Sequence, residues 1–311
     1  MPAPPKLSAE EFVHEFNTLG PYKLARKHNI SSQAVFRRRR VLERKGHILK
    51  GPTAIPRTSY PWEIALNIAD GTVLVGSDAH YPPGPPSLMH RAFVAFCKEY
   101  KPIAVVMNGD VIDAPTISKY APIGWEKRPS LADEIEVAKE RLGEIEAAAF
   151  KAQKIWPLGN HDERFESRIA TIAPEYAKIH GVHLHDHFPN WQSCWNCLIN
   201  DDVIIKHLFK GGQHGPFNST LWSGKNIILG HRHDAHVRPL DDLRGTRYGV
   251  DTGCIADTDA RTFVDYTRGS PKNWRSGFCV LTFREGRLLQ PELVLKWGDE
   301  QVQFRGEVIA P

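Results

Sequence analysis

The sequence has 311 residues, of which 41% are hydrophobic and 24% are charged, and its formal net charge is +4. Length and composition are those of an ordinary globular protein with one large domain or two smaller ones, which excludes disordered and fibrous classes. No apolar run approaches the roughly 18 residues of a membrane span, and the N-terminus lacks a signal-peptide pattern, so we expect a cytoplasmic protein without membrane attachment.

The positive charge is concentrated near the N-terminus. Residues 1–50 contain eleven Lys or Arg residues and four Glu residues, a net charge of +7, so the rest of the chain carries −3. A small basic segment joined to a mildly acidic body predicts a polyanionic partner for that segment.

The basic segment has the pattern of three short helices. Ser8 is placed to cap a helix that runs to about residue 17, and residues 22–28 form a second helix. After a tight turn, Ser31 or Ser32 caps a third helix from residue 33 to about residue 45. The short turn followed by a strongly basic helix is similar to the helix-turn-helix family, whose second helix enters the major groove of DNA.

Four consecutive arginines, Arg37, Arg38, Arg39 and Arg40, occupy the third helix. Such a run wraps around a helix and can meet phosphates on both sides of it, so these side chains are predicted to bind nucleic acid, and DNA in particular. A solvated arm or an oligomerisation hairpin is the alternative. We expect a helix-turn-helix domain at residues 1–50 and a proline-containing linker at residues 51–70.

Residues 71–311 have the pattern of one α/β domain. Its first half alternates strands with amphipathic helices, and after residue 200 strands predominate. The strands are expected at about 72–77, 103–108, 155–158, 202–206, 226–229, 248–252, 278–283 and 288–295, with helices at 87–100, 130–150 and 162–170.

Five of these strands are followed directly by polar motifs. Carboxyl ends of strands meet at one edge of an α/β sheet, so we expect the motif side chains to lie together. Carboxylate, amide and imidazole groups in this number indicate a site for two metal ions. The motifs are Asp78-Ala79-His80, Gly109-Asp110, Gly159-Asn160-His161-Asp162, Lys206-His207 and Gly230-His231-Arg232-His233.

The form and order of these motifs resemble those of calcineurin-like metallophosphoesterases, over about residues 72–295. The resemblance implies a four-layer α/β/β/α sandwich of two mixed sheets. It also implies hydrolysis of phosphoric esters by a hydroxide held between two divalent ions. Manganese is the expected metal, with Fe, Zn, Ni or Mg as alternatives. By the same resemblance, Asp78, His80 and His233 bind one ion, Asp110 bridges, and Asn160, His207 and His231 bind the other.

Three further positions near the motifs have expected roles. His161 matches the family position that protonates the leaving oxygen or stabilises the phosphoryl transition state, and Asp162 is expected to orient its ring. His207 lacks the usual following glycine, which His214 has, but we prefer His207 because it directly follows a strand. Asp113 is expected to cap a helix, with a supporting contact to the site as the alternative.

Other clusters are assigned structural roles. His183, His185 and His187 alternate, which predicts one face of a partly exposed edge strand, with a third metal site as the alternative. Cys194 and Cys197 are expected to be reduced and buried. Residues 251–254 follow a strand and are expected to line the floor of the site.

The basic segment favours phosphodiester bonds in nucleic acid as the substrate. The motif combination resembles phage- and prophage-encoded metallophosphoesterases, which places the protein in the cytoplasm of a bacterial host or a phage-infected cell. One alternative is a phosphomonoesterase or cyclic-nucleotide phosphodiesterase acting on small or protein substrates. Another is a DNA-binding protein with a vestigial phosphoesterase core. The sequence indicates no protein partner.

Overall fold

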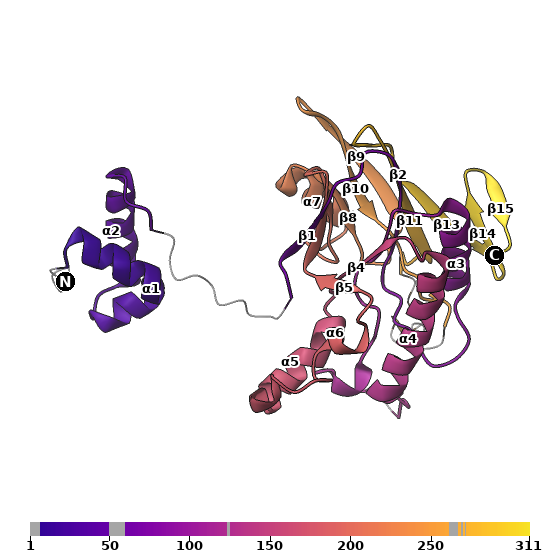
Figure 1. Cartoon of the computed structure of the whole chain (residues 1–311), viewed down its shortest axis with the longest axis horizontal. Coiled ribbons are helices and arrows are strands. Elements are labelled where there is room, and N and C mark those ends of the chain that lie inside the picture. Colours follow the sequence, from indigo (N-terminus) through magenta and orange to yellow (C-terminus); the bar gives the residue numbers. More distant parts are fainter. Residues whose placement is uncertain (1–6, 50–59, 123–124, 261–266, 269, 271) are drawn as a thin grey trace. The chain divides into compact units, whose positions relative to one another are not determined.

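A computed structural model describes residues 7–49, 60–122, 125–260, 267–268, 270 and 272–311. The chain divides into two compact units, residues 1–59 and 60–311. The first is helical and the second is α/β (Figure 1). None of the described helices is both long enough and apolar enough to cross a membrane.

The N-terminal unit is held together by apolar residues at helical spacing. Helix α1 (Ala9–Lys27) starts with a capping box between Ser8 and Glu11 and is broken at Gly20, whose φ of 75° is not helical. It therefore consists of the two successive helices that the sequence predicts. Ser31 caps α2 (Ser32–Arg44) by accepting a hydrogen bond from the N–H of Ala34. The core residues are Phe12, Phe16, Leu24, Ala25, Val35, Leu42 and Leu49.

The four arginines of α2 divide into two pairs. Arg38 lies over the Phe12 ring and donates to the carbonyl of Leu7. Arg39 lies over the Phe16 ring and pairs with Glu43 at 2.7 Å. Arg37 and Arg40, by contrast, are exposed. Consecutive helical residues are about 100° apart, so four in a row cannot share one face. Arg38 and Arg39 therefore make contacts within the N-terminal unit, and Arg37 and Arg40 are the more exposed pair.

The C-terminal unit contains two mixed sheets, counted over the described residues. The smaller has the order β1-β6-β7-β8-β10-β9, and the larger has the order β15-β14-β13-β11-β2-β3-β4-β5 with β12 beside β11. The smaller sheet comprises β1 (Glu63–Leu66), β6 (Asn196–Ile199), β7 (Val203–Ile205), β8 (Asn226–Leu229), β9 (His236–Asp242) and β10 (Gly245–Asp251). The larger comprises β2 (Gly71–Gly76), β3 (Ala104–Met107), β4 (Gln153–Pro157), β5 (Gln192–Cys194), β11 (Gly277–Arg284), β12 (Arg287–Leu288), β13 (Glu292–Gly298), β14 (Gln301–Phe304) and β15 (Glu307–Ile309).

Helices cover the outer face of each sheet, which gives four layers (Figure 1). Helices α3 and α4 share a core with the larger sheet, and α7 packs against β8, β9 and β10. The structure thus has the predicted α/β class with two mixed sheets. The helices are α3 (Leu88–Tyr100), α4 (Leu131–Ala148), α5 (Asp162–Ile172), α6 (Leu184–His187) and α7 (Gly215–Ser223), with 3₁₀ turns η1 (Pro115–Ile117) and η2 (Pro174–Tyr176).

Alternation along the central strands builds both cores. In β2, Val73 and Val75 pack in the layer between the sheets, whereas Leu74 packs on the helical side. In β11, Leu281 and Val280 divide in the same way. Successive strand residues point to opposite faces, so one continuous apolar run contributes both to the core between the sheets and to the core under the helices. Burial on both faces holds each strand, and therefore its end, in place.

Three sequence expectations differ from the structure. The linker was placed at residues 51–70, yet Glu63–Leu66 is strand β1, paired in parallel with β6; four residues with mixed exposure give little strand signal. The expected extended run at His183–His187 is helix α6 after its first residue. The expected strand at 288–295 is interrupted between β12 and β13, where Pro291 has no N–H to donate to a sheet.

Candidate metal centre

The parallel strands deliver the motifs to one place. Strands β2, β3 and β4 pair in parallel in the larger sheet, so the motifs after them, which begin at Asp78, Gly109 and Gly159, lie at the same edge. In the smaller sheet β7 and β8 are also parallel, and His207 and His231 follow them. The two edges meet, because Nε2 of His207 lies 3.9 Å from Oδ1 of Asp78.

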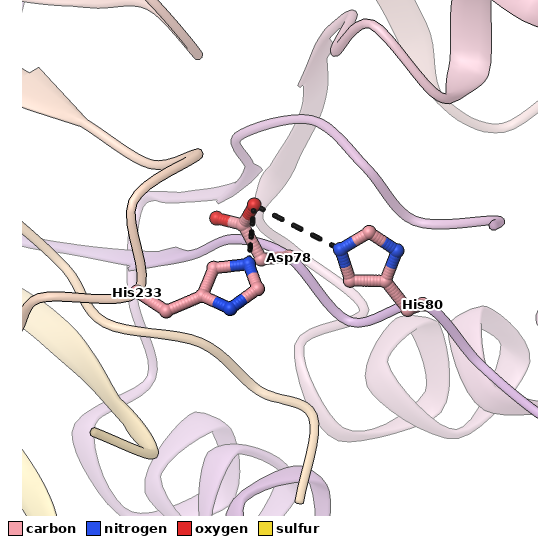
Figure 2. A group of neighbouring side chains, drawn as sticks. All are labelled: Asp78, His80 and His233. Carbon is pink, nitrogen blue, oxygen red and sulfur yellow. Dashed lines mark hydrogen bonds and ion pairs between the residues drawn. The ribbon is translucent and has the colours of Figure 1, made fainter. Parts of the chain in front are cut away.

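One group of potential ligands consists of Asp78, His80 and His233, with one ligand atom from each within 4.8 Å of the others. Nε2 of His233 lies 3.1 Å from Oδ1 of Asp78, and Nε2 of His80 lies 4.0 Å from the same oxygen. Figure 2 shows both rings directed at this carboxylate. One carboxylate and two imidazoles are a donor set that suits a divalent transition metal.

A second group adjoins the first and consists of Asp110, His207 and His231. Nε2 of His207 lies 3.1 Å from Oδ2 of Asp110. Oδ1 of Asp78 lies within 4.0 Å of histidines from both groups. The residues are therefore arranged as two neighbouring His/Asp clusters of the kind that can hold two divalent ions.

The bonding of His207 fits a cation between these side chains. Its Nδ1 lies 2.8 Å from the carbonyl oxygen of Asn108, so Nδ1 carries the hydrogen and Nε2 presents a lone pair in the neutral ring. This buried Nε2 has no hydrogen-bond partner among the described residues, and it faces the Asp110 carboxylate, which is itself an acceptor. Two facing acceptors need a proton or a metal ion between them.

The electrostatics of the protein alone lead to the same conclusion. Burial opposes ionisation of Asp78, but His233 and His207 lower its pKa to about 2. Burial also disfavours the charged form of His207, yet Asp110 and Asp78 raise its pKa to about 10. The site thus attracts positive charge, which divalent ions can supply in place of protons.

Several of the candidate ligand residues have an uncommon backbone conformation. Asp78, His80, Asp110, His231 and His233 all have positive φ, between 41° and 73°. Residues other than glycine rarely adopt this conformation, and such strain is concentrated at functional sites.

Two motif glycines, Gly159 and Gly230, allow the backbone to lie close to the carboxylates of Asp110 and Asp78. A Cβ at Gly159 would lie 2.1 Å from Oδ1 of Asp110, and a Cβ at Gly230 would lie 2.6 Å from Oδ2 of Asp78. Any side chain at these positions would displace a carboxylate of the clusters.

His161 lies beside the clusters and is held by Asp113. Its Nδ1 lies 2.6 Å from Oδ1 of Asp113, its Nε2 lies 3.9 Å from Oδ2 of Asp110, and its ring is 4.7 Å from that of His80. Asp113 was expected to cap a helix, but Ala114 takes the cap position before η1. The positive φ of Ala114 turns the chain there, and Asp113 contacts His161 instead.

The carboxylate of Asp162 has a different place from the one expected. It accepts hydrogen bonds from the N–H groups of Asp110, Val111 and Gly159 and from the Trp156 indole, at 2.8–3.0 Å. It therefore fastens the Asp110 loop to the Gly159 turn and does not orient the His161 ring. The His161 ring is contacted by Asp113 instead. Asp162 is the first residue of α5, and a side chain at the start of a helix points back toward the preceding turn, away from the ring.

The remaining sequence candidates are placed as follows. His214 is exposed at the start of α7, whereas His207 is buried within the second group. The Asn160 side chain is exposed in the turn between Gly159 and His161. In the segment 251–254, the hydroxyl of Thr252 lies 2.6 Å from that of Ser77, so this segment is bonded to the residue that precedes Asp78.

The histidines near α6 make protein contacts. Nδ1 of His183 lies 3.2 Å from Glu166 and its Nε2 lies 2.8 Å from the Ala177 carbonyl. Nε2 of His187 lies 2.9 Å from the Gly181 carbonyl. These rings stabilise the loop before α6. Cys194 and Cys197 are buried free thiols, as expected.

No family model matches the chain. It is similar to the Gene 54 protein of Mycobacterium phage D29, with 26% identity over 227 residues that cover 66% of this chain and 86% of the relative. The Gene 54 protein of Mycobacterium phage L5 is 23% identical over 230 residues, with the same coverage.

Similar solved structures include Vps29 from Entamoeba histolytica complexed with zinc, at 12% identity and a TM-score of 0.39, covering 76% of this chain and 96% of that one. A dimetal phosphatase from Danio rerio has 12% identity and a TM-score of 0.37, covering 78% and 98%. Likeness at this level carries no inference about this chain.

Proposed function

We propose that the chain is a metal-dependent phosphoesterase that uses two divalent ions. Asp78, His80 and His233 would hold one ion. Asp110, His207 and His231, with Asn160, would hold the other. Asp110 would be shared between the ions, which is the role that the family resemblance implies for it. The observation that carries the proposal is the junction of the two clusters, where one oxygen of Asp78 lies within 4.0 Å of histidines from both.

The chemistry is divided between the ions and the protein. When bound, two divalent ions activate water and neutralise the charge of the attacked phosphoryl group. In this proposal His161 is the general acid that protonates the leaving oxygen. Asp113 holds its Nδ1, and its Nε2 lies on the side of Asp110, where it can face the leaving oxygen. Asp162 keeps the Asp110 loop in place through backbone hydrogen bonds.

Chromogenic esters test this proposal directly. Metal-loaded protein should hydrolyse bis-(p-nitrophenyl) phosphate, and a comparison with p-nitrophenyl phosphate separates a diesterase from a monoesterase. Absence of turnover on both esters with every divalent metal tried would contradict the proposal and would favour a vestigial core.

We further propose that the ester lies in nucleic acid, and that α2 contacts it. Support comes from the +7 charge of residues 1–50 and from one exposed side of α2, which carries Gln33, Arg37, Arg40 and Arg44. These residues recur at intervals of three and four, opposite the buried Val35 and Leu42. Duplex DNA binding that weakens steeply with added salt is the expected behaviour.

A further inference from the structure

An arginine lies directly against His161. Arg164 is in the first turn of α5, three residues after His161, which places both side chains on one side of the helix. Its Nη2 lies 3.1 Å from Nε2 of His161, and its Nη1 donates to the carbonyl oxygen of Asp113 at 2.8 Å. The side chain is 21% exposed, so the guanidinium borders the site and remains within reach of solvent.

The partners of His161 define the direction of these hydrogen bonds. Nδ1 faces two acceptors, the carboxylate of Asp113 at 2.6 Å and its carbonyl oxygen at 3.0 Å, so Nδ1 carries a hydrogen. A guanidinium can only donate. Nε2 of His161 therefore accepts a hydrogen bond from Nη2 of Arg164, and in the free protein this donor is engaged by the ring beside the clusters.

We infer that Arg164 is an anion-binding residue of the site, and that its Nη2 transfers its hydrogen bond from His161 to a non-bridging phosphoryl oxygen of the substrate. This inference rests on the proposed phosphoesterase function. A guanidinium is suited to phosphoryl oxygens because its donors form a rigid planar fork. The bond from Nη1 to Asp113 keeps that fork oriented during the transfer.

The transfer links substrate binding to the freeing of His161. While Arg164 donates to Nε2, that nitrogen has no room for another partner. Once Nη2 turns to the phosphoryl group, the lone pair of Nε2 is released and takes up a proton from water, which Nε2 then donates to the leaving oxygen. Asp113 still holds Nδ1. Monoesters and diesters both offer non-bridging oxygens, so the inference does not depend on which of them is the substrate.

Inorganic phosphate is the probe that isolates this role. Its binding to metal-loaded full-length protein is measured by calorimetry for the wild type, Arg164→Gln and Arg164→Lys. The matched control is Arg168→Gln, an exposed arginine one turn further along α5. Loss of a charge-assisted hydrogen bond should weaken phosphate binding roughly ten- to a hundred-fold in Arg164→Gln. Arg164→Lys should fall between, and Arg168→Gln should match the wild type.

Two further readouts exclude a purely structural effect. Metal content should be unchanged in Arg164→Gln. The ¹⁵N chemical shift of Nε2 of His161 should change when phosphate binds to the wild type, because its donor leaves. In Arg164→Gln the shift should already differ before phosphate is added.

Each outcome has a defined meaning. Equal phosphate affinity in the wild type and Arg164→Gln would overturn the inference, and so would loss of metal in that variant, because Arg164 would then act by supporting the ligands. If the wild type hydrolyses no ester but phosphate binding still depends on Arg164, the proposed function fails and the anion-binding role stands.

Discussion

Oδ1 of Asp113 lies 2.6 Å from Nδ1 of His161 and 3.5 Å from Nδ1 of His80. One carboxylate thus orients the ring beside the clusters and a ring within them. Although burial opposes ionisation, these two histidines hold the pKa of Asp113 well below its usual range. Asp113 is therefore a charged support in the site at any pH near neutrality.

Replacing the Asp113 carboxylate should remove the group that orients the rings of His161 and His80. Asp113→Asn should lower turnover of a chromogenic ester by roughly 10- to 100-fold, the usual effect of losing a group that supports metal-site residues. Measurement at saturating metal separates lost orientation of His161 from weaker metal binding through His80. Wild-type turnover at saturating metal would show that the Asp113–His161 contact has no role in the reaction.

Removing the His161 ring should affect the reaction and spare the metals. His161→Ala should lower turnover by roughly 10²–10⁴-fold, the range for a lost general acid. Elemental analysis should give the metal content of the wild type. A variant that had lost metal would require His161 to be reassigned as a ligand.

Glu134 of α4 lies beneath the same turn, and its Oε1 accepts from the N–H of Ala114 at 3.3 Å. Burial and the nearby Asp113 raise the pKa of Glu134 to about 8, from 4.5. Between these two pH values the folded protein holds a proton that the unfolded chain has lost. Its stability should therefore fall as pH rises from about 4.5 to 8.

The variant Glu134→Gln mimics the protonated side chain, so its stability should not show this fall with rising pH. Its advantage over the wild type should be small near pH 5 and grow to as much as a few kcal/mol by pH 9. Urea unfolding of metal-free protein, followed by tryptophan fluorescence, measures this, because all eight tryptophans lie after residue 60. An advantage independent of pH would contradict the raised pKa.

The two pairs of arginines in α2 offer a matched comparison. Replacing Arg37 and Arg40 by Ala should weaken DNA binding and flatten the log–log salt dependence by about 0.9 per lost phosphate contact. Replacing Arg38 and Arg39 should instead destabilise the N-terminal unit, because these side chains pack over Phe12 and Phe16. If both double variants kept the wild-type salt dependence, α2 would not be the nucleic-acid surface.

Much of this arrangement follows from the sequence. Apolar runs followed by Asp78, Asp110, His207 and His231 were sufficient to place these residues at strand ends, and the structure brings them together. The neighbours of His161 could not be predicted in this way. The position of Asp113 depends on a left-handed turn at Ala114 and on Glu134, which lies 20 residues after Ala114 in the chain and accepts from its N–H.

Other errors have similar physical origins. Strand β1 is stabilised by pairing with β6, some 130 residues later, and its four residues alone have little strand character. The alternation at His183–His187 resembled a strand, but residues 184–187 form a helical turn, and the ring nitrogens of His183 and His187 bond to carbonyls of the loop before it. Local pattern cannot anticipate contacts of this kind.

Metal titration, with turnover followed at each step, tests the central claim most directly. Metal-free protein should be inactive on bis-(p-nitrophenyl) phosphate, and turnover should rise until about two divalent ions are bound per chain. Asp110→Asn should weaken both ions, because the proposal has them share this carboxylate. Full activity in metal-free protein, or full occupancy by both ions in Asp110→Asn, would contradict the account.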